Sequence, residues 1–205
     1  MSALGGETAR ARPNGRAGSG PRAHLAPAPA LIVLAAVTLT AFYYFARTDT
    51  IGVYSAARGW ARMTPGLFTT RLHYLAAAAL LGLLPALAAR RLTGLSFASL
   101  GLGLGRWREG LVWLAIGAPL AWMLAGHATT PEMRAVYPLD PALSSRPGAF
   151  WPYAGTEFLY YGAWEVLFRG VLLFGLAPEL GFLGANAVQT ALSVTAHFGR
   201  PLTET

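Results

Sequence analysis

The chain has 205 residues, of which 54% are hydrophobic and only 12% charged, and its mean hydropathy of +0.43 is too high for a soluble domain of this size. All sixteen basic residues are arginines, most of them in the predicted loops and the amino-terminal tail, which favours contact with anionic lipid and argues against nucleic-acid binding. No cysteine is present, so disulfides, thiolate nucleophiles and cysteine-based metal sites are excluded. The composition predicts a multi-pass protein of the cell membrane.

Residues 1–26 are rich in arginine, proline and glycine and have no apolar periodicity, which predicts a disordered tail. An organelle transit peptide is the alternative, but the segment lacks the amphipathic spacing of such leaders. The apolar stretch that follows ends at Arg47 and not at a small-residue cleavage site. We therefore expect it to remain as the first membrane anchor.

A membrane helix needs about 20 apolar residues to cross a hydrocarbon core about 30 Å thick. Residues 27–205 contain five such stretches, which predict an all-α transmembrane bundle of about five membrane helices. The stretches are Pro29 to Ala46, Leu72 to Ala89, Gly110 to Ala125, Phe150 to Leu176 and Leu180 to Phe198.

The connections between these stretches carry weaker signals. Arg58 and Arg62, four residues apart between the first two stretches, suit a short interfacial helix, with an ordinary loop as the alternative. The alternating segment Gly101–Gly105 reads as a flexible interfacial connector, because Arg106 follows it and no strand precedes it, unlike a phosphate-binding loop. The four tail arginines, with Arg90 and Arg91 after the second stretch, favour a cytoplasmic amino terminus.

Polar residues recur on one face of each of the last two predicted helices. On the fourth helix they are Glu157, Tyr161, Glu165 and Arg169. On the fifth helix they are Asn186, Gln189, Ser193 and His197. A charge at the centre of a membrane helix costs roughly 3 kcal/mol, so such residues are expected to face a protein interior, a wet cavity or each other. The two stripes predict a polar interior shared by the two helices.

Glu165 and His197 are the candidate catalytic pair. A turn near residues 177–180 would place both at comparable depths, roughly 20 to 25 Å from it, in an antiparallel hairpin. There Glu165 can act as a general base on water and His197 as a proton donor or oxyanion partner, which outlines hydrolytic chemistry. Arg169 would anchor Glu165 through a charge-assisted contact.

Other interpretations of these residues stay open. Glu165 and Arg169 can simply neutralise each other, and the amide and hydroxyl side chains can tie helices together. The chain has neither His-Glu-x-x-His nor Gly-x-Ser-x-Gly. Dependence on a divalent metal ion is undecided, because only Glu165, His197 and either Glu157 or Glu204 could supply the three ligands of a catalytic zinc.

The run Glu165-Val-Leu-Phe-Arg169-Gly, followed on the next helix by His197 in Ala-His-Phe-Gly-Arg-Pro, resembles the CAAX-protease and bacteriocin-processing (CPBP) family of intramembrane endopeptidases. The resemblance covers residues 150–205. It implies an all-helical membrane protease in which glutamate and histidine activate water to cleave near the carboxyl terminus of prenylated proteins or to process peptides. Its partners would be the bilayer and a protein or peptide substrate, with a lipid group in the prenylated case.

The chain departs from the family pattern at three places. The first family motif is Glu-Glu-x-x-x-Arg, and its first glutamate, the usual water-activating base, falls on Trp164. The aromatic position four before His197 is Ser193, and the third motif has no counterpart. Residues 201–205 read as the start of a loop, which favours a fragment; the alternative is a shortened, non-catalytic member with an immunity or partner-binding role.

Overall fold

The computed structural model describes residues 27–57, 65–125, 130–136, 143 and 145–198. In these ranges it contains helices and no strand, as predicted. The predictions for residues 1–26, Arg58, Arg62, Glu204 and residues 201–205 concern positions outside the described residues.

Three helical stretches of the described chain are long and apolar enough to cross a membrane, judged by length and composition. The first, Ala28–Ala46, consists of α1 (Pro27–Ala41) and the π-helical η1 (Phe42–Ala46). The second, Phe68–Thr93, consists of α3 (Pro65–Ala77), η3 (Ala78–Leu83) and α4 (Leu84–Thr93). The third, Pro147–Ala196, consists of η6 (Pro147–Ala149), α7 (Phe150–Glu165), η7 (Val166–Phe174) and α8 (Gly175–Ala196).

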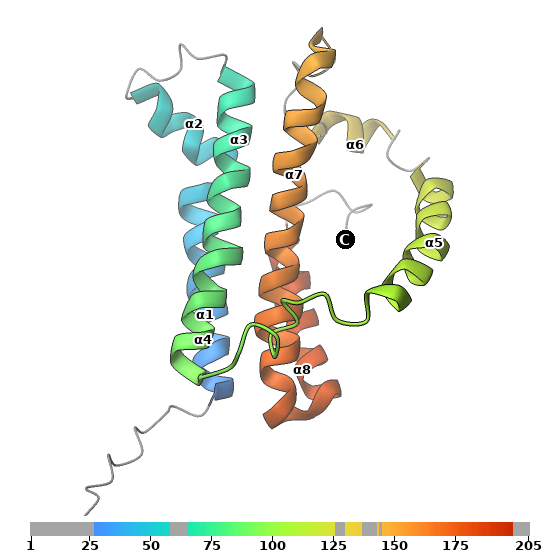
Figure 1. Ribbon diagram of the computed structural model, residues 1–205. Coiled ribbons are helices and arrows are strands. Elements are labelled where there is room, and N and C mark those ends of the chain that lie inside the picture. The colour runs from blue at the N-terminus through green and yellow to red at the C-terminus, as the bar shows by residue number, and fades with distance from the viewer. Residues whose placement is uncertain (1–26, 58–64, 126–129, 137–142, 144, 199–205) are drawn as a thin grey trace, which may run out of the picture.

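The third stretch folds back on itself and so contains both of the last two predicted helices. Gly181 breaks it, with φ 69° and ψ 166°, one residue after the predicted turn. Along a straight helix Trp164 and His197 would lie roughly 50 Å apart. Their rings are instead 6.1 Å apart, because the segment after Gly181 runs back beside η7. Figure 1 shows this hairpin in orange and red.

The remaining predicted membrane helix is present as a helix but does not join the bundle. It forms α5 (Trp107–Leu124), which has no buried residue and stands apart from α7 in Figure 1. The short helices α2 (Thr48–Ala57) and α6 (Pro131–Val136) complete the described elements. The prediction of five membrane helices is therefore not confirmed: the described residues are all-helical and contain three apolar stretches of membrane length.

The bundle core lies where α1, α4, η7 and α8 pack together. Its fully buried side chains come from the first and last parts of the described chain and include Leu31, Leu81, Leu100, Phe168, Leu172 and Leu176. Leu100 belongs to the connector between α4 and α5, so this connector is anchored in the core. Gly101 is required beside it, because its φ is +72° and a Cβ there would lie 2.7 Å from the Phe174 ring.

Glu179, next to the hairpin turn, ties the first helix to the last. Its Oε1 accepts a hydrogen bond from the backbone N–H of Ala28 at 3.1 Å. Ala28 lies in the first turn of α1, where backbone N–H groups have no partner within the helix. The carboxylate therefore caps α1 and complements the positive end of its dipole.

Replacing Glu179 by alanine is expected to destabilise the fold by about 1 kcal/mol, because α1 loses its cap. Glu179→Gln keeps an acceptor oxygen and should lose less. Thermal unfolding in detergent, followed by circular dichroism, measures the difference. Glu132→Ala, in the first turn of the short helix α6, is the control and should leave the melting temperature unchanged. Equal melting temperatures for Glu179→Ala and the native chain would contradict the capping role.

Candidate functional site

The polar stripe on the fourth predicted helix lies mostly on the outside of the described bundle. Glu165 Oε1 and Arg169 Nη1 form an ion pair at 2.9 Å, and their side chains are 59% and 51% exposed. Tyr161 is exposed on the same stripe, whereas Glu157 is half-buried. Glu165 ends α7 and Arg169 lies in η7, whose i→i+5 turns hold more residues than α turns. The side chains of Glu165 and Arg169, four residues apart, therefore lie on the same face of the helix across this junction.

The stripe on α8 forms hydrogen bonds mainly within its own helix. Gln189 Nε2 donates to Asn186 Oδ1 at 3.3 Å and to Thr190 Oγ1 at 2.9 Å. The Nδ1 of His197 lies 2.7 Å from the backbone carbonyl oxygen of Ser193. Because a carbonyl oxygen only accepts, Nδ1 is assigned the proton, which leaves Nε2 with its lone pair available.

His197 lies beside Trp164, one residue before the glutamate that was predicted to meet it. The Trp164 ring stacks on Phe168 at 5.3 Å with an interplanar angle of 7°, and it meets Phe42 edge-on at 5.8 Å. Glu165 has Arg169 as its polar partner, and within the described chain no hydrogen bond or ion pair joins it to His197. The predicted depth matches this geometry, but successive helical residues point about 100° apart, so neighbouring Trp164 holds the position facing His197.

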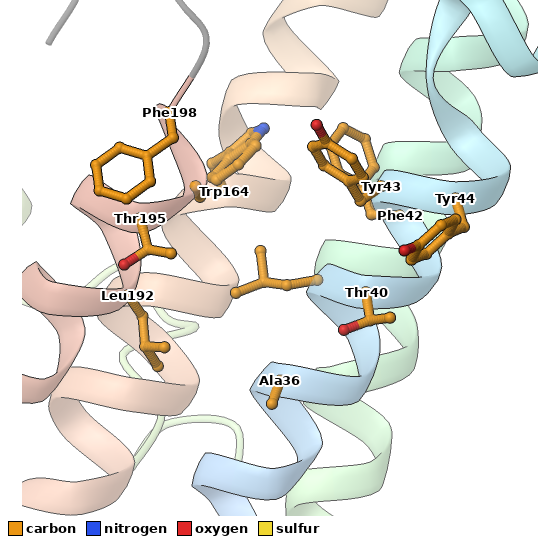
Figure 2. Close-up of a pocket in the computed structure, with 11 residues that line it drawn as sticks. Ala36, Thr40, Phe42, Tyr43, Tyr44, Trp164, Leu192, Thr195 and Phe198 are labelled. Atoms are coloured by element: carbon orange, nitrogen blue, oxygen red, sulfur yellow. The ribbon is translucent and has the colours of Figure 1, made fainter.

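An apolar groove opens beside this contact, with a volume of about 430 Å³. We call it the aromatic groove. One wall is α1 with η1, and the other is Trp164 with α8, as Figure 2 shows. Its lining includes Ala36, Thr40, Tyr43, Trp164, Leu192 and Thr195. A groove of this size and polarity suits an apolar chain or side chain.

The residues that shape the aromatic groove are not among the site residues predicted from the sequence. Tyr43 and Tyr44 end the first hydrophobic stretch, where their pattern is that of an ordinary aromatic belt. In the sequence, Trp164 stands out only as a departure from a family motif. In the structure, its Nε1 is buried without a hydrogen-bond partner. The signal in the sequence was an indole directly beside Glu165 of the polar stripe.

A second polar cluster lies between α3 and α7, apart from Glu165. Tyr74 is 1% exposed, and its hydroxyl bonds the Tyr153 hydroxyl at 2.8 Å and Glu157 Oε1 at 3.5 Å. His73, which the sequence assigned no role, is buried with Nδ1 2.6 Å from the carbonyl oxygen of Ala46. Glu157 thus bonds to this cluster. In the described residues no group of three histidine or carboxylate side chains is placed to hold a metal ion.

The chain matches no protein-family model, no curated protein and no solved structure. The geometry of the described residues is therefore the ground for any functional conclusion.

A cysteine scan tests which side of α7 meets water, because the native chain has no cysteine to interfere. Glu165→Cys in membrane vesicles should react readily with a water-soluble maleimide, since an ion pair facing hydrocarbon would be too costly. Phe168→Cys, at a position 1% exposed, should stay unlabelled until the protein is denatured. A Glu165→Cys variant that labels only after denaturation would contradict a water-facing stripe.

Proposed function

We propose that this chain is an intramembrane endopeptidase of the CAAX-processing type, in which Glu165 and His197 activate water. The observation that carries the proposal is the 6.1 Å contact between the rings of Trp164 and His197. It means that the helical turn bearing Glu165 lies directly against the end of α8. A carboxylate and an imidazole at one level of a membrane bundle are the minimum set for this chemistry.

In the proposed reaction Glu165 takes a proton from water, and the resulting hydroxide attacks the peptide carbonyl. His197 presents Nε2 toward the reaction, because Nδ1 is held by Ser193. The proton taken by Glu165 passes through the bridging water to Nε2, and the imidazolium donates it to the leaving nitrogen as the C–N bond breaks, which regenerates both groups. Arg169 balances the charge of Glu165 and holds its carboxylate. The proposal requires water or substrate to bridge Glu165 and His197, since the two side chains make no direct contact.

The aromatic groove supports a substrate that carries an apolar group. It borders Trp164 and runs along α1, so a lipid-modified or apolar peptide lying in it would present its backbone near His197. Because the lining is almost wholly apolar, the groove offers little recognition of a charged segment.

One observation favours a second function, that of a non-catalytic membrane protein with an immunity or partner-binding role. The residue facing His197 is an indole, at the position where the family resemblance calls for the water-activating glutamate. Its ring stacks on Phe168 and meets Phe42, so the position is filled by packed aromatic carbon. A membrane protein with the same helical bundle but without hydrolytic activity would have this arrangement.

Glu165→Ala and His197→Ala are each expected to lower peptide cleavage by about 10²- to 10⁴-fold, because each removes a proton-transfer group. The assay is mass-spectrometric detection of products from mixed farnesylated and unmodified peptides, with membrane insertion checked by extraction. Glu109→Ala is the matched control, since Glu109 pairs with Arg106 at 3.3 Å in another exposed ion pair far along the chain. Unchanged peptide cleavage by both Glu165→Ala and His197→Ala would contradict the mechanism.

Trp164→Glu separates the two candidate functions. If the native chain cleaves, the indole is compatible with hydrolysis and the endopeptidase stands. If only Trp164→Glu cleaves, the native chain is the non-catalytic protein, with a site that a carboxylate facing His197 restores. Cleavage by neither form, with both correctly inserted, would rule out the endopeptidase.

A further inference from the structure

A second groove lies away from the aromatic groove, between η3 with α4, the connector before α5, and α7. We call it the glycine groove; its volume is about 580 Å³. Its lining includes Ala78, Gly82, Ala86, Phe97, Gly162 and Ala163. The two helices approach closely here, since a Cβ on Gly82 would lie 3.2 Å from the Cβ of Ala163. The small side chains leave an apolar channel along the outside of the bundle.

The cationic side chain of Arg90 lies near one end of this channel. Ala78, Gly82 and Ala86 recur every fourth residue along one helical face, and Arg90 is the next position of the same series. The Arg90 guanidinium lies 4.8 Å from the centre of the Phe97 ring, and Phe97 lines the groove. A cation–π contact of this kind holds the exposed guanidinium over the groove end.

The dimensions match one leaflet of a bilayer. From Ala78 to Arg90 the helix rises about 18 Å, whereas half of a hydrocarbon core is about 15 Å. The membrane-length stretch ends at Thr93, so Arg90 lies in its last turn, where lipid phosphates are found. Guanidinium groups bind phosphate through two parallel hydrogen bonds, and basic pockets between membrane helices bind anionic headgroups.

We propose that the glycine groove binds one anionic phospholipid, with an acyl chain along Ala78, Gly82 and Ala86 and the phosphate on Arg90. The occupant is a bilayer lipid and not a free anion, because Phe97 both lines the apolar channel and contacts the Arg90 guanidinium. This binding site is independent of the endopeptidase chemistry and of Glu165 and His197.

The charge is tested with the full chain reconstituted in vesicles of equimolar phosphatidylglycerol and phosphatidylcholine. After mild detergent extraction, native mass spectrometry counts the lipids that stay bound. The native chain should retain phosphatidylglycerol preferentially, and Arg90→Gln should lower that preference about fivefold. Arg91→Gln is the matched control, since it removes the same charge from the same helical turn, pointing about 100° away. Equal loss in the two variants would overturn the site in favour of diffuse surface charge.

The channel is tested by filling it. A Cβ at Gly162 would meet no atom within 4 Å, so Gly162→Leu can occupy the groove without a clash from its first carbon. Gly155→Leu is the matched control, because Gly155 is also open, lies on the same helix and is outside the groove. Gly162→Leu should abolish the retention of phosphatidylglycerol, and Gly155→Leu should leave it unchanged. Full retention of phosphatidylglycerol by Gly162→Leu would refute the proposal. If that variant fails to fold, the comparison of Arg90→Gln with Arg91→Gln tests the proposal by itself.

Discussion

The return of the chain at Gly181 is the constraint on which the candidate site depends. A continuous helical stretch of 50 residues would extend roughly 75 Å, far beyond the thickness of a bilayer. The backbone of Gly181, with φ 69°, lets the chain reverse where other residues would be strained. Once reversed, α8 lies along η7, and α1 packs against both. The aromatic groove and the contact of His197 with Trp164 follow from that packing.

The sequence predicted the positions of the helices and the matching levels of the turns that carry Glu165 and His197, because both follow from composition and rise per residue. The apolar stretches matched the described helices within a few residues at most ends, and the turn was placed one residue from Gly181. The ion pair between Glu165 and Arg169 was also predicted by spacing and is confirmed at 2.9 Å. These features are local, so one helix or one turn determines each of them.

The rotation of α7 about its axis could not be predicted, since it depends on packing with helices far away in sequence. Trp164 faces His197 because its ring fits against Phe168 and Phe42, the latter from the first helix. A rotation by one residue would bring Glu165 inward and lose this aromatic packing. The position of α5 outside the bundle could not be predicted for the same reason. Its apolar sequence predicts a helix, but no pattern within it indicates which helix it contacts.

The position of the candidate site along the bundle axis affects how water reaches it. Ala28 is bonded to Glu179 at one end of the bundle, and Phe42 meets Trp164 about 21 Å further along α1. If a hydrocarbon core about 30 Å thick begins at the Ala28 end of the bundle, that level falls in its outer third. The exposed rings of Tyr43 and Tyr44 lie beside it, at the position of an interfacial aromatic belt. With the bundle placed in this way, water would reach His197 and the Glu165 ion pair from one side without crossing the membrane.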